Sequence, residues 1–250
     1  MSELRAIPIR GVPDIKPGDD IPAILLAALR AQRRPLAQGD ILVITHKIIS
    51  KAEGQIVPLA SIGPSQEANE WAAKYNLDPR ITQIATAESK RIVKRGHGVT
   101  ITETPHGFIC ANSGVDASNV DGGRSVVLLP RDPDQSAQRI YRSLKRKLGF
   151  PVPIIISDSF GRAWREGLAE VAIGLAGMRA FRDSRGARDP YGYKLKVTLE
   201  AVADELAGMA GLACGKLTRL PACIIRGHAF QPGRGRARDL IRAAERDMFR

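Results

Sequence analysis

The chain has 250 residues, of which 44% are hydrophobic and only 5% aromatic, and it carries a formal net charge of +12. This length and apolar fraction allow a substantial core in one large domain or two small ones, and because no low-complexity linker divides the chain we expect a single domain over residues 1–250. The charge favours an anionic partner, but few aromatic residues and no recognisable nucleic-acid module disfavour nucleic acid. No signal-peptide segment and no apolar run near the ~18 residues of a membrane span are present, so we expect a cytoplasmic protein without membrane contact.

Helices and strands are predicted in mixed order along the chain. Asp19 or Asp20 starts a helix through Arg30, and Asp78, followed by Pro79 in the first turn, starts one through Val93. Further helices are predicted over residues 133–148 and 200–213, and strands over residues 40–45, 151–156 and 222–226. Residues 99–103 and 107–111 flank a turn and predict a hairpin. The absence of regular βα alternation predicts an α+β fold rather than a Rossmann sheet.

The C-terminal segment and the cysteines carry weaker signals. Leu240, Ile241, Ala244 and Met248 fall at helical spacing among interleaved arginines and acids, which favours an amphipathic closing helix over a nucleic-acid patch. The cysteines lack zinc-ligand spacing and lie in apolar contexts. We therefore expect three buried thiols, Cys110, Cys214 and Cys223.

The segment from Gly211 to Leu217 is not a phosphate-binding loop. It has one residue too few between Gly211 and Gly215, and Leu217 stands where Ser or Thr would follow Lys216. A P-loop fold is therefore excluded, and no G-x-G-x-x-G follows a strand. A bound nucleotide would have to be held by lysines, a metal ion and backbone amides from elsewhere, and Lys47 and Lys51, just after the predicted strand 40–45, are candidates. Lysines in such a place are also commonly just solvated.

Two stretches place an acid beside small polar residues. Asp116 lies in the segment 110–120, and Asp158, followed by Ser159, lies where the apolar strand 151–156 is expected to end. Mg²⁺ and Mn²⁺ prefer such carboxylate and hydroxyl oxygens, usually with substrate phosphates. A structural alternative remains open, because Asp and Ser are also common turn residues.

The order of several motifs makes the chain resemble one family. They are GVPDI (11–15), GDILVITHKIISKAEG (39–54), GFICANSGVDASNV (107–120), SDSFGRAWREG (157–167), RGARDPYG (185–192), GK (215–216) and IIRG (224–227). From about Pro8 to the C-terminus, the chain is similar to the coenzyme F420-0:L-glutamate ligases, the gamma-glutamyl ligases that extend the tail of a deazaflavin coenzyme. The resemblance implies their unusual α+β fold and an intertwined homodimer. Some relatives carry a second, flavin-reductase-like domain, which we do not expect here.

The resemblance also implies the site residues. The residues matched to guanine-nucleotide contacts are Val12, Pro13, Asp14, Ile15, His46, Lys51 and Asn119, with Lys47 as a neighbouring candidate. The residues matched to divalent-metal ligands are Asp116, Asp158 and Ser159. His46 departs from the family pattern, in which Ser or Gln is common at this position. The implied cofactors are Mg²⁺ or Mn²⁺, with K⁺ as a candidate additional cation, and GTP as co-substrate.

The implied reaction is amide formation. GTP would phosphorylate the carboxylate of coenzyme F420-0 to an acyl phosphate, the amine of L-glutamate would attack it, and gamma-linked glutamates would follow. Asp116 and Asp158 would act through the metal, and Arg162 could clamp a substrate carboxylate or phosphate. A structural ion pair between Glu166 and a neighbouring arginine is an equal alternative. The loop 185–192 is a substrate-proximal candidate.

Two other classes of function remain open from the residues alone. The same acids and lysines would serve another metal- and nucleotide-dependent ligase or kinase. A basic nucleic-acid-binding protein is the less favoured alternative; it would bind without a divalent metal and with a steep salt dependence.

Overall fold

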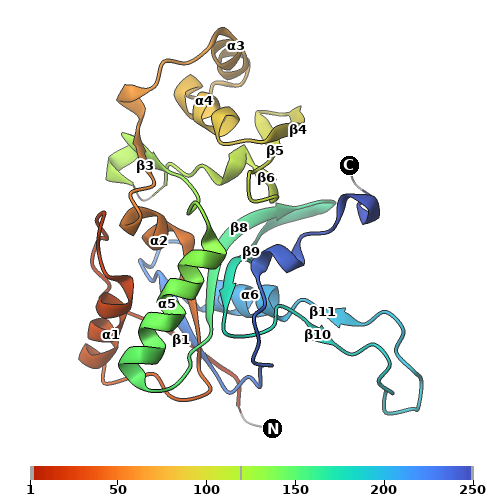
Figure 1. Ribbon diagram of the computed structural model, residues 1–250. Coiled ribbons are helices and arrows are strands. Elements are labelled where there is room, and N and C mark those ends of the chain that lie inside the picture. Colours follow the sequence, from red (N-terminus) through yellow and green to blue (C-terminus); the bar gives the residue numbers. More distant parts are fainter. Residues whose placement is uncertain (1–2, 119, 249–250) are drawn as a thin grey trace.

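The computed structural model describes residues 3–118 and 120–248 (Figure 1). Its helices are α1 (Ile21–Ala31), α2 (His46–Ala52), α3 (Gln66–Tyr75), α4 (Pro79–Ala87), α5 (Pro133–Leu148) and α6 (Val202–Cys214). Its strands are β1 (Arg5–Pro8), β2 (Ile41–Thr45), β3 (Ile56–Pro58), β4 (Arg91–Gly96), β5 (Val99–Glu103), β6 (Ile109–Ala111), β7 (Ser125–Val127), β8 (Ile154–Arg162), β9 (Arg165–Ala176), β10 (Arg182–Asp183), β11 (Leu199–Glu200) and β12 (Ala222–Arg226). Short 3-10 helices are η1 (Leu59–Ser61), η2 (Asn112–Gly114), η3 (Asp121–Gly123), η4 (Ala237–Leu240) and η5 (Ala244–Arg246). This mixture confirms the predicted α+β class.

A five-stranded sheet in the order β1-β12-β2-β8-β9 forms the centre of the molecule (Figure 1). Only β2 and β8 run parallel, whereas the other neighbouring pairs are antiparallel. A Rossmann sheet would be mostly parallel. The mixed order therefore agrees with the expectation drawn from the irregular sequence of helices and strands.

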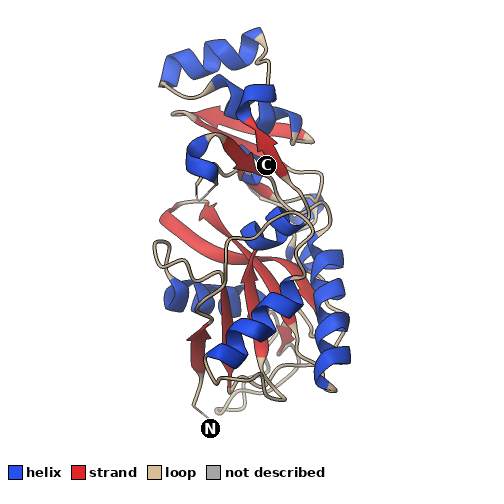
Figure 2. Ribbon diagram, turned by 90° about the vertical axis from the view of Figure 1, so that its left-hand side faces the viewer, coloured by secondary structure: helices blue, strands red, loops and turns tan. Residues whose placement is uncertain are grey.

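Helices cover both faces of this sheet (Figure 2). On β2, Leu42 and Ile44 pack into a core with residues of α1, α2 and α5, whereas Ile41 and Val43 pack into a second core with residues of α6. Successive strand side chains point to opposite faces, so a strand covered on both sides is apolar throughout. Burial of both faces of the sheet therefore explains the unbroken apolar runs in the sequence.

A second lobe lies beyond the central sheet and contains α3, α4 and the sheet β4-β5-β6 (Figure 1). A small core joins α4 of this lobe to the pair of β3 and β7, and its buried residues are Leu59, Ile84, Val126 and Leu128. Strand β6 leads through η2 into the turn that carries Asp116. The lobe therefore positions one half of the candidate site.

The helix starts follow the signals in the sequence. The carboxylate of Asp20 accepts a hydrogen bond from Ala23 N, and that of Asp78 accepts one from Arg80 N, with a proline early in each helix. Such N-caps satisfy amide groups that lack a partner within the helix. Helix α5 spans the predicted residues 133–148 and ends at Gly149 in the left-handed conformation.

The predicted helix from Asp78 through Val93 is too long. Helix α4 ends at Ala87, and the chain then forms β4, which pairs with β5 in a three-stranded sheet. The buried carboxylate of Glu103 on β5 binds Lys90 at 3.1 Å and Arg91 at 2.7 Å. A buried carboxylate requires such partners, and this long-range contact overrides the local helical pattern.

The prediction of an amphipathic closing helix is wrong. The described C-terminal residues form only η4 and η5. Asp239 accepts a hydrogen bond from Arg236 N, and Asp134 of α5 accepts one from Ala237 N at 2.8 Å. These side chains bind the backbone amides that begin the turn and fasten it to α5, so the segment packs as irregular structure.

Two of the three cysteines are buried as expected. Burial, with the nearby charge of Asp158, raises the pKa of the Cys110 thiol to about 12, and Cys223 is buried in β12. Cys214 is only half-buried, which corrects the expectation for this residue. A hydrogen bond with the Cys223 thiol lowers the pKa of Cys214.

Across the described residues, no helix combines the length and the apolar character needed to cross a membrane.

Candidate active site

The candidate site lies where β2 ends beside β8. Thr45, the last residue of β2, pairs with Ser157 of β8, so the next residues of the two segments, His46 and Asp158, lie side by side. The expectation that the strand stops before Asp158 is wrong, because β8 continues to Arg162 as one arm of a long hairpin with β9. Asp158 therefore projects from a strand and not from a turn.

The β8–β9 hairpin has a register shift next to Asp158, and a side chain of α6 binds the backbone there. The pairing of β8 with β9 shifts between Ile156 and Ser157, and the carboxylate of Asp204 accepts a hydrogen bond from Ala172 N at 2.9 Å. Burial raises the pKa of Asp204. A shift of this kind changes the direction of the side chains that follow it.

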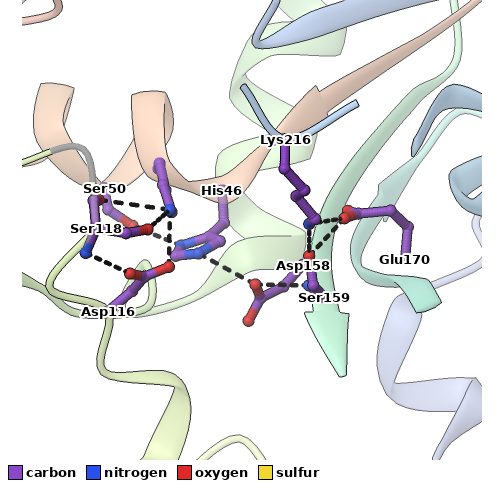
Figure 3. A network of polar contacts seen from close by, with 9 residues as sticks. His46, Ser50, Asp116, Ser118, Asp158, Ser159, Glu170 and Lys216 are labelled. Carbon is purple, nitrogen blue, oxygen red and sulfur yellow. Dashed lines mark hydrogen bonds and ion pairs between the residues drawn. The ribbon is translucent and has the colours of Figure 1, made fainter. Parts of the chain in front are cut away.

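His46 begins α2 and lies between the two predicted metal acids (Figure 3). Its side chain is 1% exposed, with Nε2 3.3 Å from Asp158 Oδ1 and Nδ1 3.4 Å from Ser50 Oγ. The Nε2 contact lacks hydrogen-bond alignment, so it is a close polar contact and not a hydrogen bond. Asp158 Oδ1 also accepts a hydrogen bond from Ser159 N at 2.7 Å. His46 therefore packs against the acid and limits its orientation.

Asp116 is bound to a lysine of α2. Lys47 Nζ lies 2.7 Å from Asp116 Oδ2 and donates to Ser118 Oγ at 2.6 Å, and Ser118 N donates to Asp116 Oδ1 at 2.6 Å. Burial by itself would raise the pKa of Asp116, but the hydrogen bonds from Lys47 and Ser118 and the lysine charge outweigh burial and lower it. The carboxylate is therefore ionised at neutral pH, as a metal ligand must be.

Ser159 belongs to a second network next to Asp158 (Figure 3). Its hydroxyl donates to Glu170 Oε1 at 2.5 Å, and Lys216 Nζ contacts both Ser159 Oγ and Glu170 Oε1. Glu170 lies on β9 directly opposite Ser159, and Lys216 lies just after α6. The structure therefore brings together residues from α2, the Asp116 turn, both strands of the hairpin and the segment after α6.

The segment matched to the guanine nucleotide lies next to α2. Val12 packs against the core, Ile15 is buried, and Pro13 and Asp14 are exposed. Gly18 N donates to Ala52 O, which ties this segment to the end of the helix that carries Lys47 and Lys51. Asn119, the remaining predicted nucleotide contact, lies outside the described residues.

The predicted arginine lies farther along the hairpin. Arg162 is exposed at its tip, and its guanidinium donates to the backbone oxygen of Glu166 at 3.1 Å. In the loop 185–192, Asp189 accepts hydrogen bonds from Tyr191 N and Tyr193 N. This loop belongs to the arm formed by β10 and β11, which extends away from the body of the molecule (Figure 1).

The residues around His46 fit a hard divalent cation. Asp116, Asp158 and Ser159 offer only oxygen atoms, the donors that Mg²⁺ and Mn²⁺ prefer. Within residues 3–118 and 120–248, no three His, Cys, Asp or Glu side chains form a metal-binding group by themselves. A cation here would need ligands from a substrate as well, which is the usual arrangement for Mg²⁺ with phosphates.

The contributions of Glu170, Lys216 and Ser118 were not predicted from the sequence. Lys216 stood out only in a rejected phosphate-binding loop and in the short GK motif of the family resemblance, which gave it no role, and Glu170 lies in an ordinary strand pattern. Their contacts join residues far apart in the chain, such as Lys216 with Ser159. No local motif records such a contact.

Carboxylates, hydroxyls and lysine ammonium groups gathered where β2 ends beside β8 are typical of an enzyme site, and comparisons with known proteins show that the enzyme is a ligase. The family described as F420-0:Gamma-glutamyl ligase matches residues 10–227. The chain belongs to this family.

Three curated relatives are similar over nearly their whole length. "Coenzyme F420:L-glutamate ligase" of Methanothermobacter thermautotrophicus is 44% identical over 98% of each chain. The protein of the same name from Methanocaldococcus jannaschii is 44% identical over 100% of this chain and 99% of its own. That from Methanopyrus kandleri is 42% identical over 99% of this chain and 98% of its own.

Proposed function

We propose that the protein is a GTP-dependent ligase that adds L-glutamate to coenzyme F420-0 through an acyl phosphate, and then adds gamma-linked glutamates. Family membership and the relatives' name, coenzyme F420:L-glutamate ligase, support the acceptor and the amino acid. The observation that supports the nucleotide-dependent step is that Lys47 of α2 binds Asp116 while its neighbour His46 contacts Asp158, which adjoins Ser159.

Each group has a task in this proposal. Lys47 and Lys51 on α2 would bind GTP phosphates, next to a guanine site formed by residues 12–15. Asp116, Asp158 and Ser159 would hold Mg²⁺ or Mn²⁺, which when bound neutralises charge on the phosphates. His46 would keep Asp158 in place, and Arg162 would bind a substrate carboxylate. K⁺ is the candidate additional cation.

The proposal includes a single ligase domain that acts as a homodimer. The arm that carries β10 and β11 exposes Tyr191, Tyr193 and Val197. Large apolar side chains gathered on an extended arm are typical of a surface that packs against another chain.

The test is incubation with coenzyme F420-0, L-glutamate, GTP and Mg²⁺ or Mn²⁺, followed by mass spectrometry. The coenzyme should gain whole glutamate units. One GDP and one phosphate should be released for each amide bond that forms. Product formation without a nucleotide would contradict the proposed mechanism, and no glutamate incorporation with either metal would contradict the ligase assignment. Replacing GTP by ATP is the matched control for the nucleotide.

Lys51→Ala should weaken GTP binding about ten- to hundred-fold, since a charge-assisted contact with phosphate contributes ~1.5–3 kcal/mol. Titration of GTP against each protein measures the effect. Lys16→Ala is the matched control, because Lys16 is an exposed lysine in the Pro-Gly-rich segment before α1. Equal small losses in both variants would assign the effect to general electrostatics and remove Lys51 from the site.

A further inference from the structure

Lys216 is a charged residue of the site to which the family resemblance assigns no role. It follows Gly215 at the end of α6, and its ammonium group lies against Ser159 Oγ and 2.5 Å from Glu170 Oε1. Ser159 Oγ lies 2.5 Å from the same Glu170 oxygen. The three side chains form a closed triangle on the side of Asp158 away from Asp116 (Figure 3).

Glu170 is fixed in this triangle by the fold. It pairs with Ser159 across the β8–β9 hairpin, and its side chain is only 13% exposed. Gly211 of α6 leaves room for it, because a Cβ at that position would lie 2.4 Å from Glu170 Cγ. A carboxylate held in so enclosed a place requires a cation as partner. In this structure the cation is the lysine.

The hydroxyl of Ser159 cannot serve this triangle and a metal ion equally well. It donates its one proton to Glu170 and accepts from Lys216. A divalent cation that bound Ser159 Oγ would have to share that oxygen with an ammonium group of the same sign. Like charges at such a distance repel each other.

We propose that Lys216 is the resident cation of this end of the site, where it holds Ser159 and Glu170 in place and competes with the divalent cation for Ser159 Oγ. The inference rests on the proposed function only for the identity of the cation as Mg²⁺ or Mn²⁺. Its consequence is that positive charge at the Ser159 end comes from the chain, while Asp116 and Asp158 carry the metal. Lys216 is thus a positioning residue for the metal site.

The test is titration of the nucleotide-free protein with Mn²⁺, with free Mn²⁺ measured by electron paramagnetic resonance. Lys216→Met keeps the length of the side chain and removes its charge, so Mn²⁺ should bind roughly three- to ten-fold more tightly, a modest factor because Lys216 is 63% exposed and screened. Lys216→Arg, which keeps the charge, should bind Mn²⁺ like the unmodified protein. Adding Glu170→Gln to Lys216→Met should keep only part of the gain, because Ser159 Oγ stays free of the ammonium group while the uncompensated charge of Glu170 is removed.

Lys145→Met is the matched control, since Lys145 is an exposed lysine on the last turn of α5. An equal gain in this control would show a general charge effect and overturn the proposal. Unchanged or weaker Mn²⁺ binding in Lys216→Met, or no Mn²⁺ binding in any variant, would also overturn it. Melting curves confirm folding of each variant. The titration uses neither GTP nor coenzyme, so its result is independent of whether the ligase assay succeeds.

Discussion

Asp158→Asn and Asp116→Asn should each reduce turnover by on the order of 10²-fold or more while the fold survives. Asparagine keeps the size and polarity of each side chain but removes the charge that a hard cation requires. Asp158 projects from β8 beside His46, and Asp116 is bound by Lys47 and Ser118, so neither carries a core contact that asparagine would destroy. Initial rates under saturating substrates measure the loss, and melting curves measure folding.

A control variant separates the loss of a site charge from the loss of any charge. Glu67→Gln removes an exposed carboxylate that pairs with the half-buried Arg95 in the second lobe, far in the sequence from the site residues, and it should leave the rate unchanged. Near-normal turnover in either aspartate variant would exclude that residue from the metal site. Collapse of the fold in either variant would instead assign the acid a structural role.

Arg226→Met should lower the free energy of unfolding by about 3 kcal/mol. The guanidinium of Arg226 donates two hydrogen bonds of 2.7 Å to Asp40, whose side chain is 1% exposed. Loss of the arginine leaves a buried carboxylate without its countercharge, which is far more costly than loss of an exposed pair. The pair joins β12 to the turn before β2, so the measurement reports on the sheet that supports the site.

Denaturant unfolding of three variants checks this expectation. Arg5→Met removes an arginine whose partner, Glu3, is exposed, and it should change stability by less than ~1 kcal/mol. Adding Asp40→Asn to Arg226→Met should recover part of the loss, because the stranded charge is gone. If Arg226→Met costs no more than Arg5→Met, burial of Asp40 does not govern the energy of the pair.

The elements that sequence predicted well are those specified locally. Asp20 and Asp78 cap helices through amides two or three residues away, and the apolar runs of β2 and β12 record burial on both faces. The failed predictions depend on distant partners. Residues 88–93 leave the helix because Glu103 binds Lys90 and Arg91, and the C-terminal segment is fastened by Asp134.

The same distinction between local and long-range information applies to the candidate site. The acids and hydroxyls were visible as motifs, since Asp116, Asp158 and Ser159 stand in short polar stretches after apolar ones. The strand that carries Asp158 and Ser159, and the side chains that contact them, could not be predicted from these motifs. Whether β8 ends before Asp158 depends on its pairing with β9, and the partnership of Ser159 with Lys216 depends on where α6 ends.

The position of β12 in the central sheet has a consequence for the order of folding. This strand, near the end of the matched region, lies between β1 and β2, which come from the beginning of the chain. Until β12 is in place, β1 has no neighbour in this sheet and β2 presents an open apolar edge. Sheet closure must therefore be a late event during synthesis, and the growing chain depends on β12 to cover an aggregation-prone edge.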